Sequence, residues 1–515
     1  MSTTDTGRAD TAVLDRPALG WPGLDLGGLD AAGHHDHPAV VTPDGVLTHS
    51  DLVRRADRLA QVLRGHGVGP EVVCGIALER GVDAVVAMAA VLRAHGAFLT
   101  VDTDLPPKRV AALLDGARAL VTSRRLAGRF TVPGPTVLVG EDATADPVAP
   151  LPEGPADPRS LAYVSHTSGS TGAPNAVLVE HRSLRAYLRS TVRDNDLGPD
   201  TVALQLAPLG YDASIRDTLA PLLAGGSLVV LPRSALLRPE ELFEAVRAYG
   251  VNTILSTTPS FLTFLSRQDG AARALRDVRL VATSGESLRP FLAAGGRSLV
   301  PGRLVNQYGP TECTMTSTRH EVPARPEADV DLIGAPLDDV VARLLDGGMR
   351  PVPDGEVGEV YLGGVGVARG YLNRPGLTAT RFVPDPCGEP GARLYRTGDL
   401  ARRRPDGVLE YLGRNDRQIK VRGYRVDPAE VEAVLLTHPA VTGAAVTAAT
   451  DDQQRAYLVA HVTGELAQVR DTALRAHLAE ALPPHLMPRH FTRLDRFPTT
   501  RSGKVDRVAL AGGAR

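Results

Sequence analysis

The sequence predicts an α/β protein with a large layered N-terminal domain and a small, mobile α+β C-terminal domain. Short apolar stretches that suit buried strands alternate with amphipathic stretches that suit helices over most of the chain. From Gly355 the pattern changes to short strands separated by Gly/Pro turns, and after Gly413 a compact unit of about 100 residues remains, a common domain size. A chain of 515 residues is also too long for one core.

The individual elements follow from local signals. Ser50 can cap a helix that runs to about Arg64, and an almost wholly apolar helix follows over 82–93. Asp427 precedes a proline at the first helical position and a glutamate, Glu430, three residues beyond the cap, which together predict a helix start. Strands are expected at 71–78, 161–164, 203–207, 227–231, 253–256, 279–283 and 303–306.

Composition sets the boundaries and excludes several classes. Residues 1–30 show no sustained period and are expected to form a loose leader, and 140–158 hold five prolines, typical of a linker. We expect the large domain to span 1–412 and the small domain 413–515. A net charge of −2 gives no general attraction to nucleic acid or acidic membranes. With no signal peptide, no spanning segment and three scattered cysteines, a cytoplasmic protein is expected.

One loop is unusually rich in groups that can bind an anion. Residues 167–173 carry only small or hydroxyl side chains, and the apolar segment before them suits a buried strand. Two glycines let backbone N–H groups converge, and the hydroxyls add donors for phosphate oxygens. The candidate phosphate-binding residues are Thr167, Ser168, Gly169, Ser170, Thr171 and Gly172. The loop lacks the Gly-Lys-Ser/Thr ending of a P-loop, so a plain Ser/Gly linker is the alternative.

Further motifs resemble a known family. TSGSTGAP (167–174) resembles the phosphate loop of adenylate-forming enzymes, most closely the adenylation domains of nonribosomal peptide synthetases. NQYGPTE (306–312), YRTGDL (395–400), GRNDRQIK (413–420) and RSGKVDR (501–507) are similar to further motifs of that family, in the same order. The resemblance extends from about Leu47 to Arg507, so it covers nearly the whole chain.

The resemblance implies a role for each motif. Tyr308 would pack on adenine and Glu312 would bind Mg²⁺, while the two oxygens of Asp399 would accept both ribose hydroxyls. Arg414 would reach the nucleotide, and the small domain would turn about a hinge at 413–417, near Asp416. Lys504 is one of only three lysines, with Lys108 and Lys420. It would enter the site and stabilise charge on the α-phosphate and the attacking carboxylate.

One position departs from the family pattern. The loop usually continues Pro-Lys-Gly, whereas this chain has Pro174-Asn175-Ala176. A cation expected near the β- and γ-phosphates is therefore missing. Because the other nucleotide motifs are intact, we expect an active enzyme rather than an impaired nucleotide-binding relative.

The expected reaction joins an amino acid to AMP with release of pyrophosphate, using ATP and Mg²⁺. A phosphopantetheine thiol then takes the aminoacyl group. Since no carrier signature follows Arg507, a stand-alone enzyme with a separate phosphopantetheinylated carrier protein in natural product biosynthesis is expected. An aryl- or acyl-CoA ligase on the same scaffold is the alternative. Asp212 argues against it, because the family's aspartate at this position pairs with the substrate's α-ammonium.

The family's pocket positions also predict the substrate side chain. Several of them are polar here, and Arg216 decides the interpretation, because a buried guanidinium requires an anion or several acceptors. An acidic amino acid is therefore expected, followed by a polar neutral one; alternatively, Arg216 turns outward or pairs with Asp217. The positions that line the expected pocket are Asp212, Ala213, Arg216, Ser256, Ala282, Ser284, Gln307, Met315 and Thr316.

Overall fold

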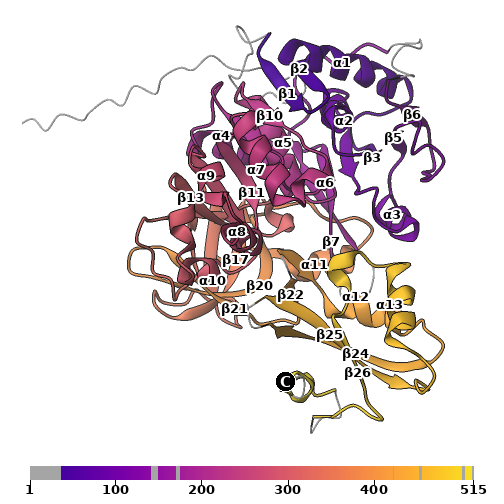
Figure 1. The fold of residues 1–515 in the computed structure, drawn as a ribbon, viewed down its shortest axis with the longest axis vertical. Coiled ribbons are helices and arrows are strands. Elements are labelled where there is room, and N and C mark those ends of the chain that lie inside the picture. The colour runs from indigo at the N-terminus through magenta and orange to yellow at the C-terminus, as the bar shows by residue number, and fades with distance from the viewer. Residues whose placement is uncertain are drawn as a thin grey trace, which may run out of the picture.

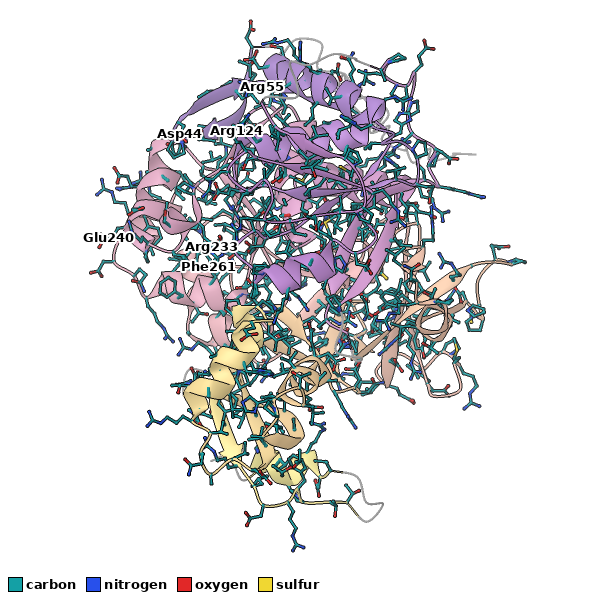
Figure 2. All side chains as sticks on the ribbon, turned by 90° about the vertical axis from the view of Figure 1, so that its right-hand side faces the viewer. Asp44, Arg55, Arg124, Arg233, Glu240 and Phe261 are labelled. Carbon is teal, nitrogen blue, oxygen red and sulfur yellow. The ribbon has the colours of Figure 1, made fainter. Side chains whose placement is uncertain are left out.

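The computed structural model describes residues 36–140, 149–169, 174–421, 423–451, 455–500 and 505–512. It contains two large sheets with helices between and outside them, followed by a smaller unit of helices and short sheets. Figures 1 and 2 both place this smaller unit, in yellow, at one end of the molecule. The predicted α/β class with a smaller α+β C-terminal part is confirmed.

The first sheet has seven strands. Its central strands pair in parallel, and antiparallel strands follow at one edge. The predicted strand at 71–78 forms one of its central strands, and the strand before the hydroxyl-rich loop is also present. The order is β18 (Gly370–Tyr371), β8 (Asn175–Glu180), β7 (Leu161–Thr167), β4 (Ala97–Thr100), β3 (Val73–Ala77), β5 (Ala119–Thr122) and β6 (Thr136–Leu138).

The second sheet has fourteen strands and changes from parallel to antiparallel pairing along its length. The five strands predicted between 203 and 306 are present as β9 to β13 and pair in parallel, and β1 extends this parallel part by pairing with β10. Its order is β16 (Val340–Leu345), β17 (Val357–Gly364), β20 (Arg393–Arg403), β21 (Leu409–Arg414), β15 (Leu332–Pro336), β14 (Thr318–Val322), β13 (Arg303–Tyr308), β12 (Leu280–Ser284), β11 (Thr253–Thr257), β9 (Val202–Leu204), β10 (Ser227–Val229), β1 (Pro38–Thr42) and β2 (Gly45–Thr48), with β19 (Phe382–Pro384) on β20.

Four helices, α1 (His49–Gly65), α2 (Val82–Arg93), α4 (His181–Asp194) and α5 (Ala213–Leu223), share one hydrophobic core with residues of both sheets. Residues 84–92 of α2 are all buried, as expected for a helix that is apolar on every side. The remaining helices of the large part are α3 (Pro107–Leu113), α6 (Arg233–Leu236), α7 (Pro239–Ala248), α8 (Pro259–Ser266), α9 (Ala271–Leu275), α10 (Arg289–Ala293) and α11 (Pro375–Arg381).

The C-terminal unit has a hydrophobic core of its own, formed by residues between Val421 and Phe491. Its elements are β22 (Ile419–Val421), β23 (Tyr424–Val426), α12 (Pro428–Leu435), β24 (Val441–Thr450), β25 (Ala456–Gly464), α13 (Asp471–Ala479), β26 (His490–Arg493) and α14 (Arg507–Gly512). The division at 412/413 and the hinge remain predictions. No helix in the part of the chain that the structure describes has the length and apolar character needed to cross a bilayer.

One of the two predicted helix starts needs correction, and the other is confirmed. The α1 cap is Thr48 rather than Ser50, because the Thr48 side chain accepts a hydrogen bond from the Asp51 N–H at 3.2 Å. At α12, Asp427 does cap the helix by accepting from the Ala429 N–H at 3.1 Å. The Glu430 carboxylate does not turn back to the cap, because it forms an ion pair with Arg109 of α3.

We predict that Thr48→Ala lowers the free energy of unfolding by about 1 kcal/mol, because one orphan N–H of the α1 start loses its acceptor. Ser50→Ala is the matched control and should change it by less than about 0.5 kcal/mol. Urea unfolding midpoints measure both effects. A larger loss for Ser50→Ala would restore the original assignment of the cap.

Candidate functional site

Several of the predicted site residues that the structure describes lie where parallel strands of both sheets end. Thr167 is the last residue of β7, and Tyr308 is the last residue of β13. Ser256 lies near the end of β11, and Ser284 ends β12, where it is in register with Gln307 of β13. Carboxyl ends of parallel strands share one edge of a sheet, which is where α/β proteins place their ligands.

The hydroxyl-rich loop connects two paired strands, β7 and β8. Thr167 is buried and pairs across the sheet with Asn175 of β8. The Ser168 hydroxyl donates at 2.8 Å to the backbone carbonyl of Arg425, which belongs to the C-terminal unit. Gly169 follows directly, whereas Ser170, Thr171 and Gly172 lie outside the described residues. Phosphate binding by this loop stays a prediction.

Asp399 of β20 joins the other predicted nucleotide contacts. The Tyr308 hydroxyl donates to its Oδ2 at 2.7 Å, and Arg414 donates to its Oδ1 at 2.6 Å. Burial, followed by the charge of Asp399, raises the pKa of Tyr308 well above its usual value, so this phenol remains a donor. The Tyr411 hydroxyl also donates to Oδ1, at 3.4 Å. Because each carboxylate oxygen has two lone pairs, Oδ2 retains capacity to accept from a ligand hydroxyl.

The turn after Tyr308 requires a glycine at position 309, because the backbone packs closely against it. A side chain at Gly309 would place Cβ 2.6 Å from the Ser317 backbone nitrogen, closer than real contacts allow. The chain then passes through Glu312 in a short 3₁₀ turn (Thr311–Cys313) and through Thr314 and Met315, both with positive φ. This path returns the backbone onto β13 and fixes the position of Glu312.

Glu312 is only 1% exposed, and its carboxylate is held by side chains from two other parts of the chain. Its Oε1 accepts from the Tyr371 hydroxyl at 2.7 Å, and its Oε2 lies 3.0 Å from Nη1 of Arg425. Although burial alone would raise the pKa of Glu312, Arg425 and Tyr371 lower it below its usual value. The group is therefore an ionised carboxylate.

A single carboxylate of this kind fits Mg²⁺, which is usually bound by one or two carboxylates together with phosphates and water. Among the described residues, no cluster of three His, Cys, Asp or Glu side chains could hold a metal without such a ligand. Any ion here would therefore depend on Glu312 and the bound nucleotide.

Asp212 presents a buried acceptor without a partner. It lies at the start of α5, and within the described chain its Oδ2 has no hydrogen-bond donor. Burial raises the pKa of Asp212, while Thr311 and Arg216 oppose the shift. A ligand cation beside this oxygen would satisfy it and favour the charged form.

Arg216 points inward from α5 and is only 2% exposed. It donates to Ser256, Tyr187 and Thr316 at 2.7–3.1 Å, and also to Oε1 of Gln307. All four acceptors are neutral. The interpretation that Arg216 turns outward is wrong.

Arg216 also has no ion pair within the described ranges. Asp217 instead accepts from the backbone N–H groups of Leu206 and Ala207, each at 3.0 Å. Two donors in this cluster remain available. Nη2 of Arg216 has two hydrogens but only Ser256 as an acceptor among the described residues, and Nε2 of Gln307 is buried without a partner there.

The remaining predicted pocket positions surround this cluster. Ala213 follows Asp212 in α5, and its carbonyl accepts from Ser256 at 3.2 Å. Ala282 lies in β12, and Met315 is buried beside Thr316, whose hydroxyl donates to Gln307 at 3.2 Å. Sequence reasoning missed Tyr187, because a tyrosine on the inner face of α4 cannot be distinguished from a core residue in the sequence.

The C-terminal unit contributes side chains that the sequence did not single out for the site. Arg425 reaches Glu312, and Nζ of Lys420 lies 5.0 Å from the ring centre of Tyr411 and 5.7 Å from that of Tyr308. Burial lowers the pKa of Lys420, although Asp399 opposes the shift. The scarcity of lysine was a signal for Lys420, but nothing distinguished Arg425 among many arginines.

The two residues predicted for the moving parts, Asp416 and Lys504, keep their roles as predictions. Asp416 accepts from Arg414 at 2.8 Å and from the Gln418 N–H at 3.1 Å. Lys504 lies outside the described residues. The segment after it is anchored to the C-terminal unit, since Arg507 pairs with Glu432. Figure 1 shows α14 at the end of the molecule remote from β20 and β22.

Comparison with known proteins gives the family context for this geometry. The model of the AMP-binding enzyme family matches residues 29–372, and that of the AMP-binding enzyme C-terminal domain matches 430–504. The chain is 42% identical over 513 residues to phosphinothricin tripeptide synthetase PhsC from Streptomyces viridochromogenes, covering 97% of this chain and 46% of that protein. It is 36% identical over 482 residues to tyrocidine synthase 2 from Brevibacillus parabrevis, covering 92% and 13%. The chain thus spans less than half the length of these relatives.

Solved structures share the fold. One is a holo nonribosomal peptide synthetase protein that contains adenylation and PCP domains and is bound to a vinylsulfonamide inhibitor. Its TM-score is 0.81 at 26% identity, covering 96% of this chain and 84% of that one. An amide bond synthetase from Marinactinospora thermotolerans has a TM-score of 0.83 at 24% identity, covering 93% and 98%, and it supports the fold alone.

Proposed function

Because the chain belongs to the AMP-binding enzyme family, we propose that it activates an acidic amino acid and transfers it to a carrier protein. The chain is an adenylate-forming ligase of the nonribosomal peptide synthetase adenylation type, and this family uses ATP. The side chain of the substrate, the use of Mg²⁺ and the carrier step are the parts proposed.

In the first step, a carboxylate oxygen of the amino acid forms a bond to the α-phosphorus of ATP. The bond from that phosphorus to the β-phosphate oxygen breaks, and pyrophosphate leaves. Residues 167–172 and Lys504 would hold the phosphates, while Tyr308 and Asp399 would hold the adenosine. Glu312 would bind Mg²⁺, which neutralises the charge that develops on the phosphates.

In the second step, the thiol sulfur of a phosphopantetheine arm attacks the aminoacyl carbonyl. AMP leaves with the bonding electron pair, and the thiol proton is released. The arrangement of the C-terminal unit supports this step, because Arg425 of β23 reaches Glu312 while Arg507, at the start of α14, pairs with Glu432 of α12. The C-terminal unit would therefore have to turn between the two steps.

The observation that carries the amino-acid assignment is that the buried Oδ2 of Asp212 has no hydrogen-bond donor among the residues the structure describes. A buried acceptor costs free energy unless a ligand satisfies it, and an α-ammonium supplies both charge and donors. The test is pyrophosphate exchange over amino acids, their des-amino analogues and simple carboxylic acids. Exchange with simple carboxylic acids alone would favour the acyl-CoA ligase alternative, and no exchange with any substrate would favour an impaired relative.

We predict that Asp212→Ala lowers kcat/KM for the best amino acid by about 10²-fold or more, because an unpaired ammonium would be buried at a cost of a few kcal/mol. The same change should leave the des-amino analogue nearly unaffected, and Asp212→Asn, the isosteric control, should resemble Asp212→Ala. Pyrophosphate exchange measures all three. Unchanged kcat/KM for the amino acid in both variants would remove Asp212 from substrate recognition.

The acidic side chain is inferred from Arg216 and Gln307. A cation surrounded by neutral acceptors, beside an unpartnered amide N–H, forms a site that favours a two-oxygen anion. A carboxylate on the substrate would meet both free donors and neutralise the guanidinium. A carboxamide such as that of glutamine supplies one acceptor oxygen and no charge, so it ranks second.

We predict that Arg216→Ala lowers kcat/KM for the preferred acidic amino acid by about 10²-fold or more relative to its amide, because only the carboxylate loses an ionic partner. Thermal unfolding serves as the control for folding, since four buried acceptors lose their donor. An exchange screen on wild type and variant provides the measurement. A wild-type preference for an aliphatic amino acid would show that Arg216 does not recognise the substrate side chain. A preference for the acidic amino acid that persists in Arg216→Ala would show the same.

We predict that Lys504→Ala slows pyrophosphate exchange by about 10²–10³-fold while ATP binding and folding are nearly intact, because one preorganised donor is lost from the transition state. Lys108→Ala is the matched control, since Lys108 is exposed and pairs with Glu480 at the surface. Wild-type exchange in Lys504→Ala would show that this lysine takes no part in the first step.

A further inference from the structure

The ion pair between Glu312 and Arg425 joins the two parts of the molecule inside the site. Glu312 belongs to the large part, whereas Arg425 lies on β23 of the C-terminal unit, 113 positions further along the chain. Two further bonds hold the Arg425 side chain: its Nη2 donates to the Tyr395 hydroxyl at 3.3 Å, and its Nε donates to Oε1 of Gln418 at 2.6 Å. The carbonyl of the same residue accepts from Ser168 in the hydroxyl-rich loop.

Close backbone packing brings Arg425 to this position. A Cβ on Gly285 would lie 3.0 Å from the carbonyl oxygen of Gly423, and a Cβ on Gly423 would lie 2.4 Å from Cγ2 of Thr258. Both glycines also have positive φ. The chain beside β23 therefore fits tightly against the ends of β11 and β12, so Arg425 does not reach Glu312 through side-chain length alone.

The charges prevent Arg425 and Mg²⁺ from contacting Glu312 at the same time. Glu312 is almost fully buried, so its carboxylate requires a cation. Its Oε1 already accepts from Tyr371, which leaves Oε2 as the oxygen that faces Arg425. A guanidinium and a dication at that one oxygen would repel each other strongly in a site with little water. Glu312 can thus serve one of the two at a time.

We propose that Arg425 is a positioning residue that replaces Mg²⁺ at Glu312 once pyrophosphate has left. This inference rests on the proposed role of Glu312 as the Mg²⁺ ligand. While the metal is bound, Arg425 lacks its anion, and docking of β22 and β23 is disfavoured. After the metal has gone, the buried carboxylate attracts Arg425, and the C-terminal unit settles into the arrangement seen here, which suits the thiol step.

The test is hydrogen–deuterium exchange of the amides in β22 and β23, which reports docking directly. Wild-type protein should show slow exchange alone, and exchange about tenfold faster with MgCl₂ and the non-cleavable analogue α,β-methylene-ATP. Arg425→Gln should exchange fast under both conditions. Arg425→Lys, which keeps the charge, should restore part of the protection and its Mg²⁺ response. Arg489→Gln removes the same charge from an exposed position of the C-terminal unit and should behave as wild type.

A second measurement tests the proposed role of Arg425 separately from the proposed Mg²⁺ role of Glu312. The Mg²⁺ concentration that half-saturates pyrophosphate exchange should fall several-fold in Arg425→Gln, because a competitor for Glu312 is gone, and should rise in Glu312→Gln. An unchanged value in Glu312→Gln would overturn the Mg²⁺ role of Glu312. A raised value there, with wild-type protection of β22 and β23 in Arg425→Gln, would overturn the role of Arg425 alone.

Discussion

Buried charge is the constraint on which the site depends. The fold places Glu312, Asp399 and Arg216 almost wholly out of water, and each would be costly there without partners. The layered architecture makes this placement possible, because two sheets and four helices exclude solvent while the ends of the parallel strands converge. Stability and chemistry are therefore linked, since the contacts that make each charge tolerable also set its direction.

The nucleotide side and the substrate side of the site satisfy this constraint differently. Asp399 is held by Tyr308 and Arg414 within the protein, so its orientation does not depend on a ligand. Asp212 and Gln307 each retain a buried polar atom that has no partner among the described residues. Preorganised groups suit a cofactor-like nucleotide that is the same in every reaction cycle, whereas unsatisfied groups give selectivity, because only the matching substrate relieves them.

Much of this could be predicted from the sequence, for identifiable reasons. The strands β9 to β13 and helix α2 depend on local apolar patterns, and the motif residues Tyr308, Glu312 and Asp399 lie in short, recognisable segments. The cap of α1 was assigned wrongly because Thr48 and Ser50 are both good capping residues and only backbone geometry distinguishes them. Glu430 could not be predicted either, because its partner Arg109 lies in α3, in a distant part of the sequence.

Contacts between the two parts of the molecule are the hardest to predict from the sequence, and the proposed change in docking of the C-terminal unit depends on them. No local signal connects Arg425 with Glu312, since the contact exists only when the C-terminal unit adopts one orientation. An interface of this kind must be strong enough to populate the docked state yet weak enough to release it. An ion pair whose cation a metal can replace meets both requirements. Mg²⁺ would be present at Glu312 during adenylation, and Arg425 would take its place after pyrophosphate has left.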